Sequence, residues 1–205
     1  MLSMATTIHS QSLSFGIRTG INSATVNVED ESGLNVEPES RTGLDIGLML
    51  EIGLTEDFSI QPEIHYMQKG FEQVFEILGD EFESELSLNY LEIPILAKYS
   101  FGSETVRGFV NAGPSLGYAL SGKTIESFNG DKEETDLDFE EEEFSRLDFS
   151  FALGGGIGFK TGPATIFVDV RYLLGLSNLD DSENDTTVRN RGLGFAVGAM
   201  FPLGE

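Results

Sequence analysis

The chain has 205 residues, enough for one sizeable domain, and it contains no cysteine, which excludes disulfides and cysteine-ligated metal. Its formal net charge of −23 argues against nucleic acid as a partner, because no basic patch is present to displace counterions from phosphates. Since 40% of the residues are hydrophobic, the chain is not a disordered acidic polymer, and its acidic and apolar residues must be segregated.

The first ten residues contain small side chains but no basic start, and they are too short for a whole signal peptide. We expect residues 1–10 to be either the remnant of a signal peptide or an ordinary disordered terminus. The remaining segment, residues 11–205, is expected to form a single domain.

Strict alternation of apolar residues with small or polar ones begins at Leu13. In the clearest segment, Arg41 to Leu54, every second residue from Leu44 onward is leucine or isoleucine, a pattern typical of a strand. The alternating segments, in chain order, are 13–21, 41–54, 58–67, 91–100, 110–120, 149–158, 165–175 and 192–201. Eight strands of about 10 to 14 residues are longer than those of most soluble sheets and suit a tilted membrane crossing.

The connections between these segments alternate in length. Residues 55–57, 102–105 and 160–163 are tight turns, whereas 23–40, 71–87, 122–146 and 177–189 are long. The long connections hold 25 of the 35 acidic residues. This arrangement predicts an all-β, eight-stranded, antiparallel up-and-down transmembrane β-barrel in the outer membrane of a Gram-negative-type bacterium, with short periplasmic turns and long, acidic extracellular loops.

The polar face of the strands favours a membrane barrel over a soluble one, because it consists largely of glycine, alanine and serine, as a narrow lumen requires. Its charges nearly cancel, which predicts a salt-bridged lumen network. The members of this network are Arg18, Asp45, Glu51, Glu63, His65, Lys69, Glu92, Lys98, Arg107, Asp148, Asp169 and Arg171. Pro62, Pro94 and Pro114 fall inside strands, where we expect bulges or irregular pairing.

Several segments resemble the PorT-like outer-membrane β-barrel family. They are Ser59–Gly70 with its Gln-Pro-Glu element, Leu88–Tyr99 with Leu-Glu-Ile-Pro, Asn111–Tyr118 and Arg171–Asn178. The resemblance runs over roughly residues 12–203. It implies an eight-stranded barrel of the kind typical of Bacteroidota and accounts for the prolines as family features.

These patterns leave more than one function open. We expect a monomeric, non-enzymatic structural or interaction module without a cofactor, in contact with outer-membrane lipids and lipopolysaccharide. Glu63 and His65 share a strand face and suggest, as an alternative, a lipid-modifying hydrolase. A secretion-associated barrel with periplasmic partners is a third hypothesis. The acidic run from Asp131 to Glu143 could bind divalent cations, although it lacks EF-hand spacing.

Overall fold

The computed structural model describes residues 12–29, 35–36, 38–77, 80–128, 131–141, 143–182 and 186–204, so the predicted terminal segment 1–10 lies outside the described residues. None of the described residues form a helix long and apolar enough to cross a membrane. Their strands are β1 (Leu13–Glu29), β2 (Asn35–Val36), β3 (Glu39–Gly53), β4 (Phe58–Ile77), β5 (Asp80–Gly102), β6 (Val106–Phe128), β7 (Asp131–Asp136), β8 (Leu147–Thr161), β9 (Ala164–Gly175) and β10 (Thr187–Pro202).

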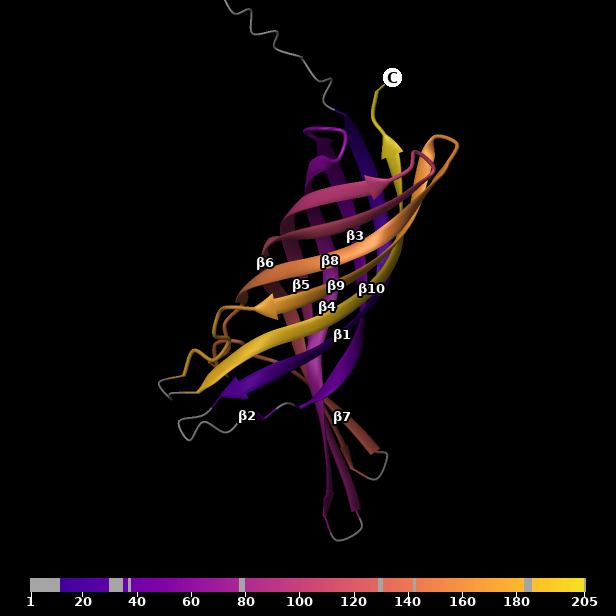
Figure 1. Cartoon of the computed structure of the whole chain (residues 1–205). Coiled ribbons are helices and arrows are strands. Elements are labelled where there is room, and N and C mark those ends of the chain that lie inside the picture. The colour runs from indigo at the N-terminus through magenta and orange to yellow at the C-terminus, as the bar shows by residue number, and fades with distance from the viewer. Residues whose placement is uncertain are drawn as a thin grey trace, which may run out of the picture.

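Eight long strands form a closed antiparallel barrel (Figure 1). Each pairs with the next long strand along the chain, and β10 pairs with β1 from Ser14–Pro202 to Glu29–Thr187, which closes the ring. The predicted eight-stranded up-and-down barrel is therefore confirmed. The two short strands, β2 and β7, lie within segments predicted as long loops.

The two ends of the barrel differ. At one end, which we call the turn end, residues 54–57, 103–105 and 162–163 connect neighbouring strands tightly. Thr55 Oγ1 accepts a hydrogen bond from the Phe58 amide at 3.0 Å, and Gly162 supplies the positive φ of 62° that its turn needs. The opposite end, which we call the loop end, carries the long connections and lies at the bottom of Figure 1.

Part of the predicted loop region is regular sheet. β4 continues to Ile77, β5 starts at Asp80 and β6 reaches Phe128, so the expectation of loops was wrong for residues 71–77, 80–87 and 122–128. Together with β7, these extensions form what we call the projecting sheet, which extends beyond the barrel (Figure 1). Its Phe82 and Phe128 rings pack with centroids 4.8 Å apart.

The prolines interrupt the backbone pairing of their strands without shifting its register. Between the pairs Pro62–Ile95 and His65–Glu92 the β4–β5 ladder is broken, but the register is the same on both sides. The expectation of bulges or irregular pairing at the prolines is therefore confirmed as irregular pairing, without a bulge. Register shifts occur elsewhere, between Ser40 and Asp45 and between Asn89 and Tyr90.

The barrel is apolar outside and polar inside. Outward apolar residues of the alternating segments are exposed. Ile17, Leu48 and Leu153, for example, are 48–57% exposed. The inward face is crowded and depends on glycine: a Cβ at Gly156 would lie 2.0 Å from the Val168 carbonyl oxygen. An exterior of this kind suits lipid, because lipid chains do not penalise exposed leucine and isoleucine.

Candidate functional site

The interior charges form three groups stacked along the barrel. The central group comprises Arg18, Asp45, Glu63, His65, Asp169 and Arg171; the loop-end group comprises Lys69, Glu92 and Asp148; and the turn-end group comprises Glu51, Lys98 and Arg107. All twelve residues predicted for the lumen network therefore have an ionic partner. They are divided among separate groups rather than joined in one network.

The central group is held by charge-assisted hydrogen bonds across the barrel. Arg171 on β9 donates to both carboxylate oxygens of Glu63 on β4, at 2.7 and 3.2 Å. Arg18 on β1 lies between Asp45 and Asp169, with Nη2 3.1 and 3.3 Å from their oxygens. Four strands thus contribute charges to one cluster, whose side chains are at most 5% exposed.

His65 lies between two carboxylates. Its Nδ1 is 2.8 Å from Asp45 Oδ1 and its Nε2 is 2.5 Å from Glu63 Oε2. An ionised carboxylate only accepts hydrogen bonds, so the ring satisfies both contacts when it carries a proton on each nitrogen. The central group then contains three cations and three anions. Gly47 of β3 lies opposite His65 of β4 and leaves room for the ring, because a Cβ at Gly47 would lie 2.8 Å from the imidazole.

Lys69 is the centre of the loop-end group. Its Nζ donates to Asp148 at 2.8 Å and lies 2.8 Å from Glu92, in a contact that lacks hydrogen-bond alignment. The ammonium group also sits 4.6 Å from the centre of the Tyr90 ring. Neutral side chains complete the group: Ser115 donates to Glu92 at 2.6 Å and Asn190 to Asp148 at 2.8 Å.

The sequence analysis missed these neutral partners. Tyr90, Ser115 and Asn190 are buried on the inward face. Tyr90 shares the alternation of Glu92, Ser115 that of Arg107, and Asn190 that of the inward glycine Gly192. Their place in the alternation was the available signal. Their role could not be assigned because it depends on which strands meet across the lumen.

Apolar clusters separate the charged groups. Met49, Phe109, Phe167 and Met200 pack between the turn-end and central groups, and Met67, Leu96, Ala152 and Leu173 pack between the central and loop-end groups. At the loop end, Phe139 packs on Leu88, Tyr90 and Ala119 and covers the interior. The cavities found beside the central and loop-end groups measure only about 10 Å³ each, so the interior is filled by side chains.

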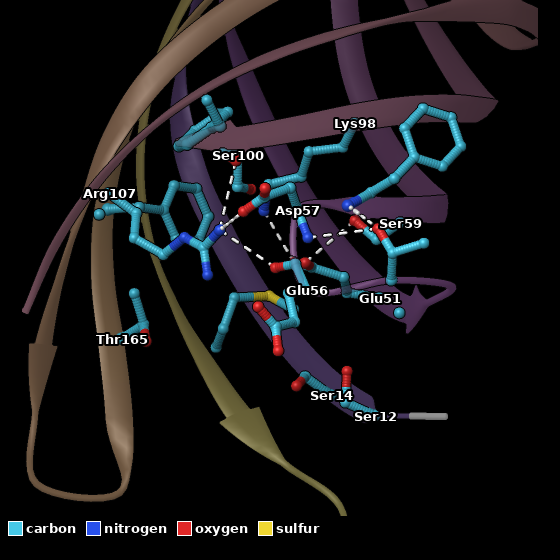
Figure 2. Close-up of a pocket in the computed structure, with 17 residues that line it drawn as sticks. Ser12, Ser14, Glu51, Glu56, Asp57, Ser59, Lys98, Ser100, Arg107 and Thr165 are labelled. Atoms are coloured by element: carbon cyan, nitrogen blue, oxygen red, sulfur yellow. Dashed lines mark hydrogen bonds and ion pairs between the residues drawn. The ribbon is translucent and has the colours of Figure 1, made fainter. Parts of the chain in front are cut away.

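The turn end is hollow. A cavity of about 220 Å³ opens there, which we call the vestibule (Figure 2). Lys98 Nζ lies 2.7 Å from Glu51 Oε2, and Ser59 donates to the other oxygen of Glu51 at 3.1 Å. Arg107 pairs with Asp57 at 2.5 Å. Because the Arg107 side chain is 38% exposed, its predicted place within a filled lumen is corrected to the mouth of the vestibule.

Metal ligands are not gathered in the part of the chain that the structure describes. Within those residues, no group of three or more histidine, aspartate or glutamate side chains is arranged to hold a metal ion. The described acidic residues near the loop end, including Asp131, Glu133 and Glu134, are exposed on strand β7 and project separately.

A closed eight-stranded barrel with an apolar exterior and a filled, charge-paired interior is the architecture of a small outer-membrane β-barrel. The chain belongs to the outer membrane protein beta-barrel domain family, whose model matches residues 9–181. It is an outer-membrane protein, as predicted. Its turn end faces the periplasm and its loop end the cell exterior.

Solved structures with a similar fold are outer-membrane proteins of several kinds. Neisserial surface protein A is 13% identical, with 91% of this chain and 96% of that chain covered and a TM-score of 0.47. Ail, the attachment invasion locus protein of Yersinia pestis, is 18% identical, with 95% and 100% covered and a TM-score of 0.43. The outer membrane enzyme PagL is 14% identical, with 89% and 99% covered and a TM-score of 0.39. No curated protein matches the sequence.

Proposed function

We propose that the chain is a monomeric, non-enzymatic outer-membrane barrel that acts as a structural or interaction module through its acidic extracellular segments. The observation that carries this proposal is the filled interior: the two buried ionic groups and the apolar clusters beside them leave only cavities of about 10 Å³. A barrel of this kind stabilises and displays its loop end rather than conducting solutes. Its lipid-facing exterior contacts outer-membrane lipids, including lipopolysaccharide at the loop end.

The geometry of His65 favours this role over that of a lipid-modifying hydrolase. A hydrolytic triad needs one ring nitrogen for the nucleophile and one for the orienting acid. Here Asp45 and Glu63 occupy both nitrogens, inside a side chain cluster that is shielded from lipid. A His65→Ala variant tests the distinction: loss of a lipid hydrolysis activity measured for the wild-type protein would contradict the non-enzymatic role.

Conductance tests the closed interior. In planar bilayers, the purified chain is expected to give no stable channels. An Arg18→Ala, Arg171→Ala double variant removes both guanidinium groups of the central group and is expected to produce brief, noisy openings. Stable single-channel steps from the wild-type protein would overturn the proposal of a closed barrel.

The acidic segments give the interaction role its chemistry. Glu83, Glu85, Glu133 and Glu134 all lie on the projecting sheet, outside the lipid-facing belt. Proteoliposomes carrying the chain should bind polylysine-coated particles at low salt and release them as salt screens the charges. A variant with these four glutamates changed to glutamine is expected to bind at least about tenfold fewer particles. Equal binding by both would contradict an interaction role based on acidic charge.

The vestibule favours a second candidate, a secretion-associated barrel with periplasmic partners. It is a cavity of about 220 Å³ at the turn end, and its rim presents Arg107 and Asp57 to the periplasm. This candidate agrees with the segments that resemble the PorT-like family, Gln61–Glu63 and Leu91–Pro94, and we propose that closer kinship. The test compares the proteins secreted by cells that carry the wild-type chain with those secreted by cells that carry an Arg107→Glu variant. Unchanged secretion would remove the support for this second candidate.

A further inference from the structure

Strand β7 presents an unpaired edge at the outer end of the projecting sheet. It pairs with β6 along one side, from Lys123–Asp136 to Phe128–Asp131, and within the described chain it has no strand on its other side. All six of its residues are exposed. Figure 1 shows β7 extending away from the barrel, where a partner could approach it without meeting the membrane.

The register identifies which backbone groups of β7 are free. The Leu137 amide donates to the Gly122 carbonyl at 3.0 Å, so Leu137 faces β6. Hydrogen-bonded and outward-facing residues alternate along an antiparallel strand. The amide and carbonyl groups of Lys132, Glu134 and Asp136 therefore point away from β6, at the spacing that an added strand would use.

The charges of β7 decide which kind of strand this edge would accept. β7 carries four carboxylates and one ammonium group. Glu126 on β6 lies directly opposite Glu133 on β7, an unfavourable pairing of like charges. Burial raises the pKa of Glu72 on the same sheet, and the nearby carboxylates of Glu85 and Glu83 raise it further. A basic segment would relieve this repulsion, whereas a second copy of β7 would increase it.

We propose that the β7 edge binds an extended, basic segment of a partner protein by strand addition, with main-chain hydrogen bonds to Lys132, Glu134 and Asp136. The inference rests on the proposed interaction role and specifies its mode. The outward backbone groups provide binding, and the carboxylates select lysine- or arginine-rich sequences. Charged edge strands also protect a sheet from aggregation, and here the same charges would exclude other copies while admitting a basic partner.

The test separates strand addition from charge attraction. The full chain is placed in nanodiscs of neutral lipid and titrated with a fluorescent peptide of about eight residues that alternates lysine with threonine. A second peptide has the same sequence with every second backbone amide methylated, which keeps its charge but removes donors. We expect binding of the first peptide and at least about tenfold weaker binding of the second.

A matched pair of variants examines the protein side. Glu134→Pro removes an outward amide without breaking a bond to β6, and Glu134→Ala makes the same change of charge while keeping the amide. We expect Glu134→Pro to weaken binding about tenfold relative to Glu134→Ala. Heat-modifiable migration on gels confirms that each variant is folded, and the methylated peptide keeps the test decisive if the proline variant fails to fold.

Three results would overturn the proposal. Equal binding of both peptides would show attraction by charge alone, which leaves the proposed interaction role intact. Self-association of the wild-type chain that Glu134→Pro abolishes would assign the edge to a second copy. No peptide binding by a chain that still binds polylysine particles would exclude strand addition, whereas failure of both would also remove the proposed function.

Discussion

Arg171 Nη1 lies 2.7 Å from Glu63 Oε2, although the two residues are 108 positions apart in the chain. Their strands, β9 and β4, are not neighbours in the barrel wall, so the pair crosses the interior. Each member of this pair needs the other, because an unpaired charge in a lumen shielded from water is strongly unfavourable. The contact therefore ties opposite walls of the barrel together.

Arg171→Met should be strongly destabilising. It leaves Glu63 and Asp169 with an uncompensated buried charge, and breaking a buried pair in this way costs about 3–5 kcal/mol in the free energy of unfolding. Urea unfolding in lipid vesicles, followed by gel migration, measures the change. Lys123→Met serves as the control, because its pair with Glu134 is exposed to solvent and should contribute little to stability. Equal effects of the two substitutions would contradict the importance of the central group.

The strands of this barrel could be predicted from residue type alone, but the charge partners could not. Alternation over Arg41 to Leu54 predicts almost the same bounds as β3, Glu39–Gly53, because one face must be apolar and the other small. The central group depends on the register that sets Gly47 of β3 opposite His65, and on contacts across the interior such as Arg171 of β9 with Glu63 of β4. Such information lies in the pairing of distant strands and not in any one of them.

The projecting sheet was missed for a related reason. Its strands carry glutamate on positions where the membrane-spanning segments carry leucine or isoleucine, so charge conceals the alternation. Glu72 and Glu85, for example, form a cross-strand pair in the same ladder as Tyr66 and Leu91. Pairing to an existing ladder allows such residues to remain in strands, because the neighbouring strand already supplies the backbone partners.

Glycine packing inside the barrel gives a second prediction. Gly156→Ala places a Cβ 2.0 Å from the Val168 carbonyl oxygen, and backbone cannot move away as easily as a side chain. We expect a loss of about 1–3 kcal/mol in the free energy of unfolding, measured by urea titration. Gly194→Ala is the control, since its Cβ would lie 3.6 Å from the nearest atom, the Arg171 carbonyl oxygen, in ordinary contact. An unchanged free energy of unfolding in Gly156→Ala would show that the barrel wall adjusts readily.

The stability of the projecting sheet should depend on pH through Glu72. Burial raises its pKa from the ordinary value of 4.5, and the Glu85 and Glu83 carboxylates act in the same direction. A raised pKa in the folded state means that folding favours the protonated form. Stability should therefore fall as the pH rises from about 4.5 through the raised value, and recover on acidification.

Hydrogen exchange of the backbone amides in 71–74 and 82–87 measures this effect. Protection should be greater at pH 4 than at pH 7 after correction for intrinsic exchange rates. Glu72→Gln should increase protection at pH 7 and reduce its dependence on pH. Glu140→Gln, a loss of the same charge on the exposed loop, should leave both unchanged. An identical pH dependence in Glu72→Gln would assign the effect to other groups.

Phe139 should decide whether the loop end stays closed. It is 5% exposed, contacts Leu88 and Tyr90, and has the Arg146 guanidinium 4.0 Å from its ring centre. Phe139→Ala removes this packing, which typically costs about 3 kcal/mol for a buried phenylalanine. Phe144 N donates to Phe139 O at 3.0 Å, and the flanking residues Leu137 and Ser145 bond to Gly122 and Leu179. Because these few backbone bonds are separate from the barrel wall, the segment should open without unfolding the barrel.

Cleavage by a glutamate-specific protease measures that opening, because Glu140 and Glu141 follow directly in the same segment. The rate of cleavage after these residues should rise in Phe139→Ala, since cleavage follows the population of the opened state. The barrel should still migrate on gels as a folded protein. Phe128→Ala, with a ring that is already 46% exposed, should leave cleavage after Glu140 near the wild-type rate. Equal cleavage of the three proteins would mean that the segment around Phe139 is held by its backbone contacts to β6 and to Leu179, and not by the Phe139 ring.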